Sequence, residues 1–407
     1  MEKRSSIFPR EIPPTAGLPL RWGDFFGAPP ESLETGIARF IGVPDAQIEC
    51  SGTASLIVAL ETFKRRSDRK CVVIPAYTCP LVPLAVRHCG LEIILCDIAP
   101  DRFDFDIAAL QRTVDRETLC VIATHLAGSI ADVSPVIDIA NQHSAFVIED
   151  AAQSLGATHR GKSAGTLGDI GFFSLAAGKG LTLYEGGILI AREAGMREAL
   201  RKMGEEIVPR NRAMEFRRVV ELLGYRIFYN PTGLRVTYGA NLRRWLTRGH
   251  PERAVGDEFD SEIPIHKAGA ARKNVGARAL PRLREAIVQN RSRAHDRIAA
   301  LENIPSLTVI RDLPGSNGTW PFIMILFRDE KQCAAALAKL WTAGLGVTKL
   351  FVHALNDYDY LKSIVPAASV PNARRFAARH LTISNSPWLS DDEFARILEV
   401  IAGCAVA

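Results

Sequence analysis

Short apolar runs that end in polar residues alternate with helical periodicity through the first half of the chain. The runs lie at 71–74, 92–96, 120–124 and 146–148, and helical stretches separate them. Buried strands that alternate with helices are typical of a mostly parallel sheet with helices on both faces. Ligands of such sheets bind at the carboxyl ends of the strands, where the fourth run is followed by Glu149 and Asp150. Asp150 is therefore the first candidate for chemistry.

The second half of the chain has a different pattern, which predicts a smaller α+β unit. A helix at 293–301, strands at 307–310 and 320–327, a helix at 330–343 and a strand at 346–350 follow one another. A chain of 407 residues is also too long for one simple core. We expect an α/β protein with an N-terminal arm at 1–30, a large domain at 31–270 and a small C-terminal domain at 271–407.

A lysine between small residues follows the apolar run at 170–173. Ser174 ends that run, and Lys179 stands between Gly178 and Gly180. Small neighbours leave room for a large group beside the amine. Pyridoxal phosphate (PLP) needs a lysine for its Schiff base, an acid at its ring nitrogen and donors for its phosphate. Lys179, Asp150 and Ser174 offer one of each, although either ionisable residue alone would more simply be a helix cap or a loop lysine.

The order and spacing of these residues resemble the DegT/StrS family of PLP-dependent sugar aminotransferases. The matching motifs are Glu149-Asp150-Ala151-Ala152-Gln153, Gly168 to Ser174 with Lys179, and Gly186-Gly187. The resemblance implies PLP fold type I, with a mostly parallel mixed sheet between helices in the large domain. It also implies that Lys179 binds PLP covalently, Asp150 contacts the ring nitrogen, Gln153 contacts the ring hydroxyl and Ser174 holds the phosphate.

Ser51-Gly52-Thr53-Ala54 stands before a helical run and forms a candidate anion site. A helix start offers free backbone N–H groups, and a hydroxyl lies beside them. A plain N-cap is the simpler interpretation of such a tetrapeptide. The resemblance implies that Gly52, Thr53 and Ala54 hold the phosphate of the cofactor.

Other positions depart from the family pattern or allow two interpretations. An aromatic residue normally stacks on the cofactor where this chain has Cys79, and Tyr77 lies two residues earlier as a second candidate. His125, Glu185 and His353 are candidate substrate contacts, although we favour a structural imidazole for His125. The family's N-Y-R motif, whose asparagine reaches the phosphate in the partner subunit, has no counterpart at 263–272.

An arginine-rich segment at 209–249 lies within an atypical stretch, 196–262, of the large domain. It holds nine arginines and two glutamates, giving 9 − 2 = +7, whereas the whole chain carries +5. Aromatic residues and a helical apolar period are interleaved with the arginines. The segment is either an ordinary surface over packed helices, a dimer contact, or a peripheral contact with an anionic membrane or a phosphorylated substrate.

Composition limits the remaining function classes. Hydrophobic residues make up 47% and charged residues 23%, which is ordinary for globular proteins, and no run reaches the roughly 20 apolar residues of a membrane span. The first residues lack the apolar core of a signal peptide, so we expect a cytoplasmic protein, with peripheral contact at the inner face of the membrane as an option. Eight cysteines without CxxC spacing indicate neither a zinc site nor a disulfide framework. We expect no metal and no nucleic-acid partner.

The resemblance implies a homodimeric aminotransferase that transfers an amino group from glutamate to a keto-sugar, most simply a nucleotide-linked one. Polysaccharide, glycolipid and secondary-metabolite biosynthesis use such reactions. Two alternatives stay open: a PLP-dependent sugar dehydratase, and a non-enzymatic sensor or scaffold that keeps the fold. Related dehydratases typically carry histidine in place of the Schiff-base lysine, whereas this chain retains Lys179.

Overall fold

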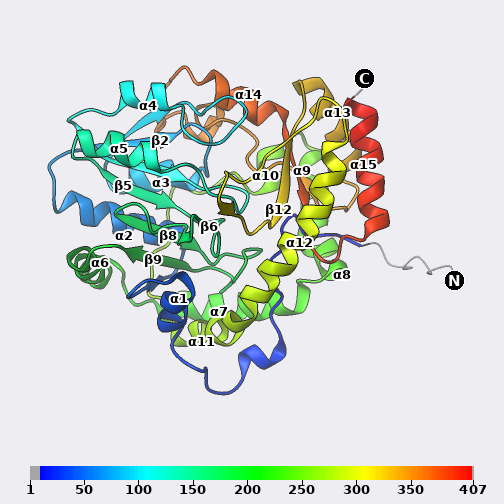
Figure 1. Cartoon of the computed structure of the whole chain (residues 1–407). Helices are drawn as coiled ribbons and strands as arrows, with labels where there is room; N and C mark the ends of the chain where they lie inside the picture. Colours follow the sequence, from blue (N-terminus) through cyan, green and yellow to red (C-terminus); the bar gives the residue numbers. More distant parts are fainter. Residues whose placement is uncertain (1–9, 406–407) are drawn as a thin grey trace.

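A seven-stranded mixed sheet lies at the centre of the larger part of the molecule (Figure 1), in a computed structural model that describes residues 10–405. The strand order is β1-β9-β8-β5-β4-β2-β3. The strands are β1 (Gln47–Glu49), β2 (Cys71–Pro75), β3 (Glu92–Cys96), β4 (Thr118–Thr124), β5 (Phe146–Asp150), β8 (Ile170–Ser174) and β9 (Gly187–Ala191). Six of them run in one direction, and β9 is antiparallel to both of its neighbours, β8 and β1. The predicted mostly parallel mixed sheet is confirmed.

Helices cover both faces of this sheet, which explains why its strands are continuous apolar runs. On one face, Cys120 and Ile122 of β4 share a core with α2 (Gly52–Lys64) and α3 (Leu81–His88). On the other face, Val121 packs with α4 (Ile107–Thr113) and α5 (Ser134–Gln142). Next to α2 lies α6 (Ala194–Ile207). Because side chains alternate along each strand, each strand contributes residues to the hydrophobic cores on both faces of the sheet.

The C-terminal part forms a second sheet, which is antiparallel. Its order is β10-β12-β14-β13, built from β10 (Thr308–Val309), β12 (Phe322–Leu326), β13 (Val347–Thr348) and β14 (His380–Ser384). The helices of this part are α12 (Leu283–Glu302), α13 (Glu330–Leu340), α14 (Pro371–Arg379) and α15 (Asp391–Ala405). Ser390 and Glu393 form a capping box at the start of α15, with Ser390 N donating to Glu393 Oε2 at 3.0 Å. The expected smaller α+β unit is present.

Several contacts tie the two parts together, so the domain boundaries at residues 30 and 270 stay predictions. A small sheet pairs β11 (Ser316–Asn317) with β6 (Thr158–His159), which in turn pairs with β7 (Lys162–Ser163). In addition, α11 (Ala270–Ala279) packs against α1 (Leu33–Ile41) and η1 (Trp22–Phe25) and continues through η3 (Leu280–Arg282) into α12. Part of the predicted arm, residues 1–9, lies outside the described residues.

The arginine-rich segment 209–249 folds into packed helices. These are α7 (Arg212–Phe228), α8 (Pro231–Leu234), the π-helical turn η2 (Arg235–Gly239) and α9 (Ala240–Leu246), and α10 (Pro251–Val255) follows. Four of the nine arginines form ion pairs: Arg217 and Arg218 with Glu221, and Arg235 and Arg243 with Glu11 of the N-terminal arm. Internal ion pairs therefore use part of the charge of this segment.

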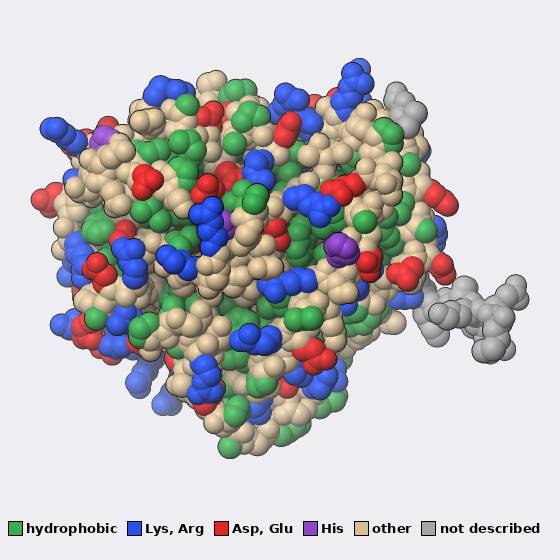
Figure 2. Space-filling model, in the orientation of Figure 1, with side chains coloured by type: hydrophobic (Ala, Val, Ile, Leu, Met, Phe, Trp, Pro, Cys, Tyr) green, Lys and Arg blue, Asp and Glu red, His purple; other side chains and the backbone are tan. Residues whose placement is uncertain are grey.

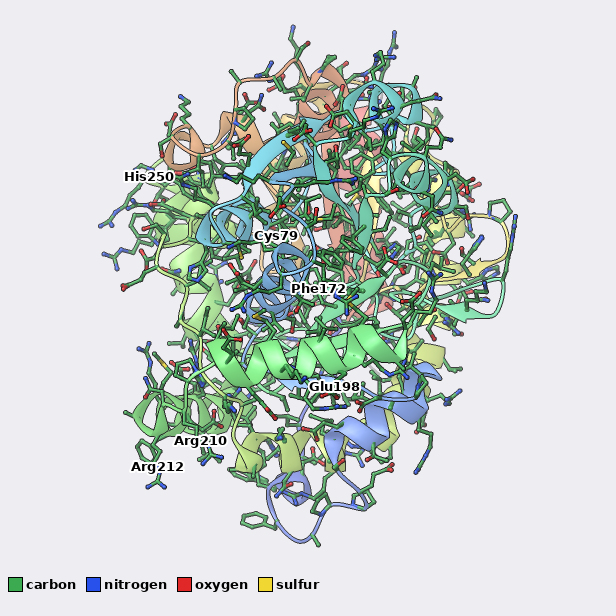
Figure 3. The ribbon with its side chains drawn as sticks, turned by 90° about the vertical axis from the view of Figure 1, so that its left-hand side faces the viewer. Cys79, Phe172, Glu198, Arg210, Arg212 and His250 are labelled. Carbon is green, nitrogen blue, oxygen red and sulfur yellow. The ribbon has the colours of Figure 1, made fainter. Side chains whose placement is uncertain are left out.

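A few arginines of the same segment do face solvent. Arg210 and Arg212 point outward at the edge of the molecule (Figure 3), and Arg244 and Arg248 lie over the ring of Trp245. Basic and acidic side chains are interspersed over the face of the molecule that Figure 2 shows. Within residues 10–405, no helix has the length and apolar character needed to cross a membrane.

Candidate active site

A cavity of about 410 Å³ opens where β4, β5 and β8 end and α2 begins. It brings together most of the predicted site residues, and Figure 3 shows Cys79 in the interior beside Phe172 of β8. The predicted residues that line it are Gly52, Thr53, Cys79, His125, Asp150, Gln153, Ser174, Lys179 and Glu185. The sheet thus places residues that are far apart in the sequence at one edge, as the strand pattern predicts.

Lys179 lies on a tight turn after β8. The turn is closed by Ala177 N, which donates to Tyr184 O at 2.7 Å, and by Lys179 N, which donates to Ala176 O at 3.2 Å. Gly178 has a φ of +78°, and its carbonyl accepts from Thr15 Oγ1 at 2.7 Å. Burial lowers the pKa of the Lys179 amine, although Cys79 and Asp150 oppose that effect. A larger share of the amine is therefore neutral and nucleophilic near neutral pH.

Asp150 ends β5 and is almost fully buried, with 3% of its surface exposed. Its Oδ1 accepts from Ala152 N at 3.1 Å. Burial raises the pKa of Asp150 to about 6, and this hydrogen bond and the charge of Lys179 only partly oppose the rise. The carboxylate is thus short of positive partners, and a protonated ring nitrogen would supply one.

The start of α2 forms an anion cradle with Ser174. The amides of Gly52 and Thr53 belong to the first turn, so they have no partner within the helix. A Cβ added at Gly52 would lie 3.3 Å from Ser174 Cβ, which shows how closely the two segments approach. Ala54 behaves differently, because its amide already donates to Ser51 Oγ at 3.0 Å and its side chain is buried away from the cavity.

Gln153 and His125 lie side by side in the wall of the cavity but are bonded differently. Gln153 Oε1 accepts from Ala127 N at 2.9 Å, which leaves its amide NH₂ to donate into the cavity. His125 Nδ1 accepts from Ala131 N at 3.0 Å, so Nε2 carries the proton and donates to Glu149 Oε2 at 3.0 Å. Both ring nitrogens of His125 are thus occupied, which favours the structural interpretation.

Glu149 is a supporting residue that sequence reasoning missed. It is fully buried, and besides His125 it accepts from Gly165 N at 2.9 Å and from Leu167 N and Gly168 N at 2.6 Å. These bonds fix the turn that leads into β8 and so set the position of Ser174. The available signal was an acidic residue inside a buried run, where an unpaired charge is costly.

Glu185 lines the cavity and is held by two arginines. Arg218 pairs with its carboxylate, and Arg272 donates to its backbone carbonyl. Arg272 is fully buried and binds Glu215 through two bonds, at 2.8 Å and 2.6 Å. Burial raises the pKa of Glu185, against the charge of Arg218. The side chain of Glu185 is therefore a positioned acceptor at the rim of the cavity.

Three predicted site residues are not brought to this cavity: Ala54, described above, Tyr77 and His353. Tyr77 is fully buried in the core, where its hydroxyl lies 3.0 Å from His380 Nε2 and accepts from Phe351 N at 3.3 Å. His353 lines a separate cavity of about 630 Å³ together with Trp341 and Lys349. Tyr77 thus supports Phe351, which does line the first cavity, instead of facing a ligand itself.

One wall of the cavity comes from residues that sequence reasoning did not single out. Val255, Gly256 and Phe259 follow the arginine-rich segment, and Phe351 follows β13. No motif marks Val255, Gly256 or Phe259, and Phe351 directly precedes Val352 and the candidate His353. Among residues 10–405, no group of three or more His, Cys, Asp or Glu side chains is arranged to hold a metal ion.

A nucleophilic amine, a buried carboxylate and an anion cradle at one sheet edge define a ligand-binding α/β protein of the fold type predicted above. The chain belongs to the DegT/DnrJ/EryC1/StrS aminotransferase family, whose model matches residues 18–228 and 266–402. Residues 229–265 lie outside the match. They include α8, η2, α9 and α10 and three residues of the cavity wall.

Similar proteins of known activity match only part of the chain. GDP-perosamine synthase of Caulobacter vibrioides is 31% identical over 213 residues, which are 52% of this chain and 56% of that protein. L-glutamine:2-deoxy-scyllo-inosose aminotransferase of Micromonospora echinospora is 34% identical over 180 residues, 43% of each chain. The chain thus spans about half the length of the curated relatives it matches.

Solved structures cover the chain more completely. Helicobacter pylori PseC, an aminotransferase of pseudoaminic acid biosynthesis, has a TM-score of 0.75 at 15% identity and covers 97% of this chain and 99% of its own. A Streptococcus pneumoniae protein described as a sugar aminotransferase, solved in PLP and PMP forms, has a TM-score of 0.74 at 17% identity. Its PLP form covers 97% of this chain and 99% of its own. At these identities the likeness shows the fold.

Proposed function

We propose that this protein is a PLP-dependent aminotransferase that moves an amino group from glutamate to a keto-sugar or a related cyclic ketone. The observation that carries the proposal is the placement of Lys179 and Asp150 in one cavity with the anion cradle of Gly52, Thr53 and Ser174. The names of the relatives support the same reaction class, and both a nucleotide-linked sugar and a free cyclitol ketone occur among their substrates.

The residues present fit PLP. Lys179 Nζ would bind the cofactor covalently, Asp150 would face its ring nitrogen, and the cradle would bind its phosphate. Gln153, with its amide NH₂ directed into the cavity, would donate to the ring hydroxyl. When bound, PLP supplies an electron sink that accepts the charge left when the Cα proton of the amino donor is removed.

The residues of the chain set the protonation states that this chemistry needs. Burial keeps a larger share of the Lys179 amine neutral. The neutral amine could then accept a proton from Cα of the amino donor and later donate a proton to C4′ of the cofactor. Asp150 stays buried and acts through its charge, which stabilises positive charge at the ring nitrogen. Phe351 and Phe259 add apolar surface to the lining of the cavity, which would favour exclusion of water from the bound ligand.

The two alternatives are less well supported. A sugar dehydratase of this family is disfavoured because Lys179 is retained and lies in the cavity. A sensor or scaffold has no use for a buried lysine and a buried carboxylate that face the same cavity, since each is costly to bury. The retained site therefore favours an enzyme.

A half-reaction experiment tests the proposal. The purified protein is loaded with PLP, glutamate is added, and the loss of the absorbance of bound PLP is followed. Nucleotide-linked keto-sugars and 2-deoxy-scyllo-inosose are then added in turn, and return of that absorbance identifies the acceptor. Glutamine serves as a second donor. Protein that never acquires the absorbance contradicts the proposal.

For the assembly, we propose a homodimer that buries the outer face of α7. Phe216, Val220 and Ile227 lie on one face of this helix with 71%, 51% and 50% of their surface exposed. Internal pairing of the neighbouring arginines weakens attraction to an anionic membrane, which favours a second copy as the occupant. Phe216→Ser with Val220→Ser should give a monomer by light scattering, whereas the control Val288→Ser should not. Binding to anionic vesicles by the wild type would instead support the membrane contact.

We also propose a cytoplasmic location. The eight cysteines are all free thiols, and most of them are buried. Free thiols persist in the reducing cytosol, whereas secreted proteins usually pair them. Fractionation of cells that express the tagged protein checks this location, and a membrane-bound fraction released by salt would point to peripheral attachment.

A further inference from the structure

The chain from Pro251 to Phe259 contributes to the cavity although it lies outside the family match. Val255 and Gly256, at the end of α10, line the cavity, and Phe259 follows three residues later. Gly256 has a φ of +82°, a conformation that favours glycine, and the next residue, Asp257, contacts the residues that follow β13. The match to the family model therefore does not extend to this part of the cavity wall.

A buried carboxylate anchors this segment. Asp257 has 4% of its surface exposed, and its Oδ2 accepts from Tyr358 Oη at 2.7 Å and from Val352 N at 2.8 Å. Its backbone carbonyl accepts from Tyr360 Oη at 2.5 Å. The Tyr358 hydroxyl in turn accepts from His353 N at 3.3 Å. One side chain therefore ties the segment to the residues that follow β13.

The anchor joins two pieces of the same cavity wall. Phe351 directly precedes the residue whose amide Asp257 binds, and Phe259 stands two residues after Asp257; both rings line the cavity. Tyr77 supports Phe351 from the core side, with ring centroids 5.6 Å apart. Loss of the Asp257 contacts would let the two rings separate.

This wall is apolar, whereas other residues of the lining carry the chemistry. Val255, Phe259 and Phe351 are apolar residues of the cavity lining, whereas Asp150 and Gln153 are polar residues of the same lining. A hydroxyl buried against an apolar wall loses its hydrogen-bond partners, which is unfavourable. A C–H edge meets the same wall without that cost.

We propose that the segment 251–259 is the acceptor-binding wall of the enzyme, that Asp257 is the positioning residue that holds it, and that Val255 and Phe259 select a cyclic ketone with a deoxygenated edge. This inference rests on the proposed aminotransfer reaction and adds the substrate class.

The variants are chosen to separate positioning from general stability. Asp257→Ala removes the acceptor oxygen, whereas Asp257→Asn keeps one oxygen that can accept from both Tyr358 and Val352. Glu258→Gln is the matched control, because Glu258 is exposed and pairs with Arg253 at 2.5 Å on the surface. Tyr358→Phe removes one of the two bonds and serves if Asp257→Ala does not fold.

The acceptor probes are 2-deoxy-scyllo-inosose and scyllo-inosose, which differ by one hydroxyl. We expect the wild type to prefer the deoxy ketone at least ~10-fold in kcat/KM, the range that one buried group provides. Asp257→Ala and Phe259→Ser should reduce that preference to less than ~3-fold, mainly by raising KM, and should keep the absorbance of bound PLP. Asp257→Asn should restore most of the preference, and Glu258→Gln should match the wild type.

Amide hydrogen exchange supplies a readout that needs no turnover. Exchange within 252–259 should be faster in Asp257→Ala, or in Tyr358→Phe, than in the wild type or Glu258→Gln. Unchanged exchange overturns the anchor. Equal use of the two ketones by the wild type, or use of neither, overturns the selection. Failure of the wild type to bind PLP would instead overturn the proposed function and the acceptor claim with it, while the exchange data would still decide the anchor.

Discussion

The two walls of the cavity differ in how the sequence encodes them. The polar wall comes from the ends of β5 and β8 and from the start of α2, and its residues belong to motifs between 51 and 187. The apolar wall comes from 251–259 and Phe351, which carry no motif and meet through one buried aspartate. The candidate chemical groups thus lie in the part of the chain that the family model matches, whereas the proposed acceptor-binding segment lies outside that match.

The largest expected effect is that of Lys179→Ala on the polar wall. The variant should lose amino transfer to below detection, because it lacks both the covalent attachment point and the group that moves the proton. Turnover of glutamate with the acceptor found in the screen measures the effect. Lys202→Ala, on the exposed side of α6, should behave as the wild type. Residual transfer within ~10-fold of the wild type would show that the chemistry uses another amine.

Asp150→Asn should have the next largest effect. The amide cannot balance a protonated ring nitrogen, and loss of one preorganised electrostatic contact typically slows an enzyme ~100-fold or more. Single-turnover rates with glutamate, at saturating PLP, measure the effect. The exposed Asp138→Asn on α5 is the control. An unchanged rate would place Asp150 in a structural role and remove the distinction between the two walls.

The same aspartate should limit the stability of the cofactor-free protein. Its pKa rises from 3.8 to about 6 on folding because burial disfavours the charge, so the folded state loses stability as the pH rises from about 4 to 6. Each pKa unit is worth about 1.4 kcal/mol, so Asp150→Asn should raise the free energy of unfolding by about 3 kcal/mol at pH 7.5.

Urea unfolding of the cofactor-free wild type and Asp150→Asn at pH 4.5 and pH 7.5 checks this expectation. The gain from the substitution should be much smaller at pH 4.5, where the wild-type carboxyl is largely protonated in the folded state. An equal gain at both pH values would mean that the cost of Asp150 is not one of charge burial.

The smallest effect is expected for the exposed arginines. Arg210, Arg212, Arg244 and Arg248 face solvent, so replacing all four with serine should leave the melting temperature and amino transfer nearly unchanged. Replacing Arg217, Arg218 and Arg243 should lower the melting temperature, because these residues hold Glu221, Glu185 and Glu11. Thermal melts of the two variants compare the groups. A larger loss for the exposed set would point to an external partner for this segment.

The sequence allowed the large sheet and most of the polar wall to be predicted, because both depend on local patterns. Buried parallel strands are visible as apolar runs, and Asp150 and Ser174 stand where those runs end. The sequence left Tyr77 open as a cofactor contact or a core aromatic, because its burial depends on Phe351 and His380, which are far away in the sequence. The arginine count could not show internal pairing for the same reason.

The apolar wall was missed on similar physical grounds. Nothing in the order of residues around Asp257 indicates that its carboxylate is buried against Tyr358 and Val352, about 100 positions later. The helical period and the charge of α7 to α10 predict surface helices. The end of α10 lines the cavity only because of its tertiary contacts, which the local sequence does not indicate. The contribution of an element to a site is thus hardest to predict from a single sequence when the element matches no family motif.

The most direct test of the central claim is to locate the PLP-bound residue by mass spectrometry. PLP-loaded wild type is reduced with borohydride, digested and mapped, with Lys202→Ala as the parallel sample. We expect one pyridoxyl adduct, on the peptide that contains Lys179. We also expect this adduct to be lost when the protein is treated with excess glutamate before reduction. An adduct on any other lysine, or none at all, would contradict the assignment of this cavity as the active site.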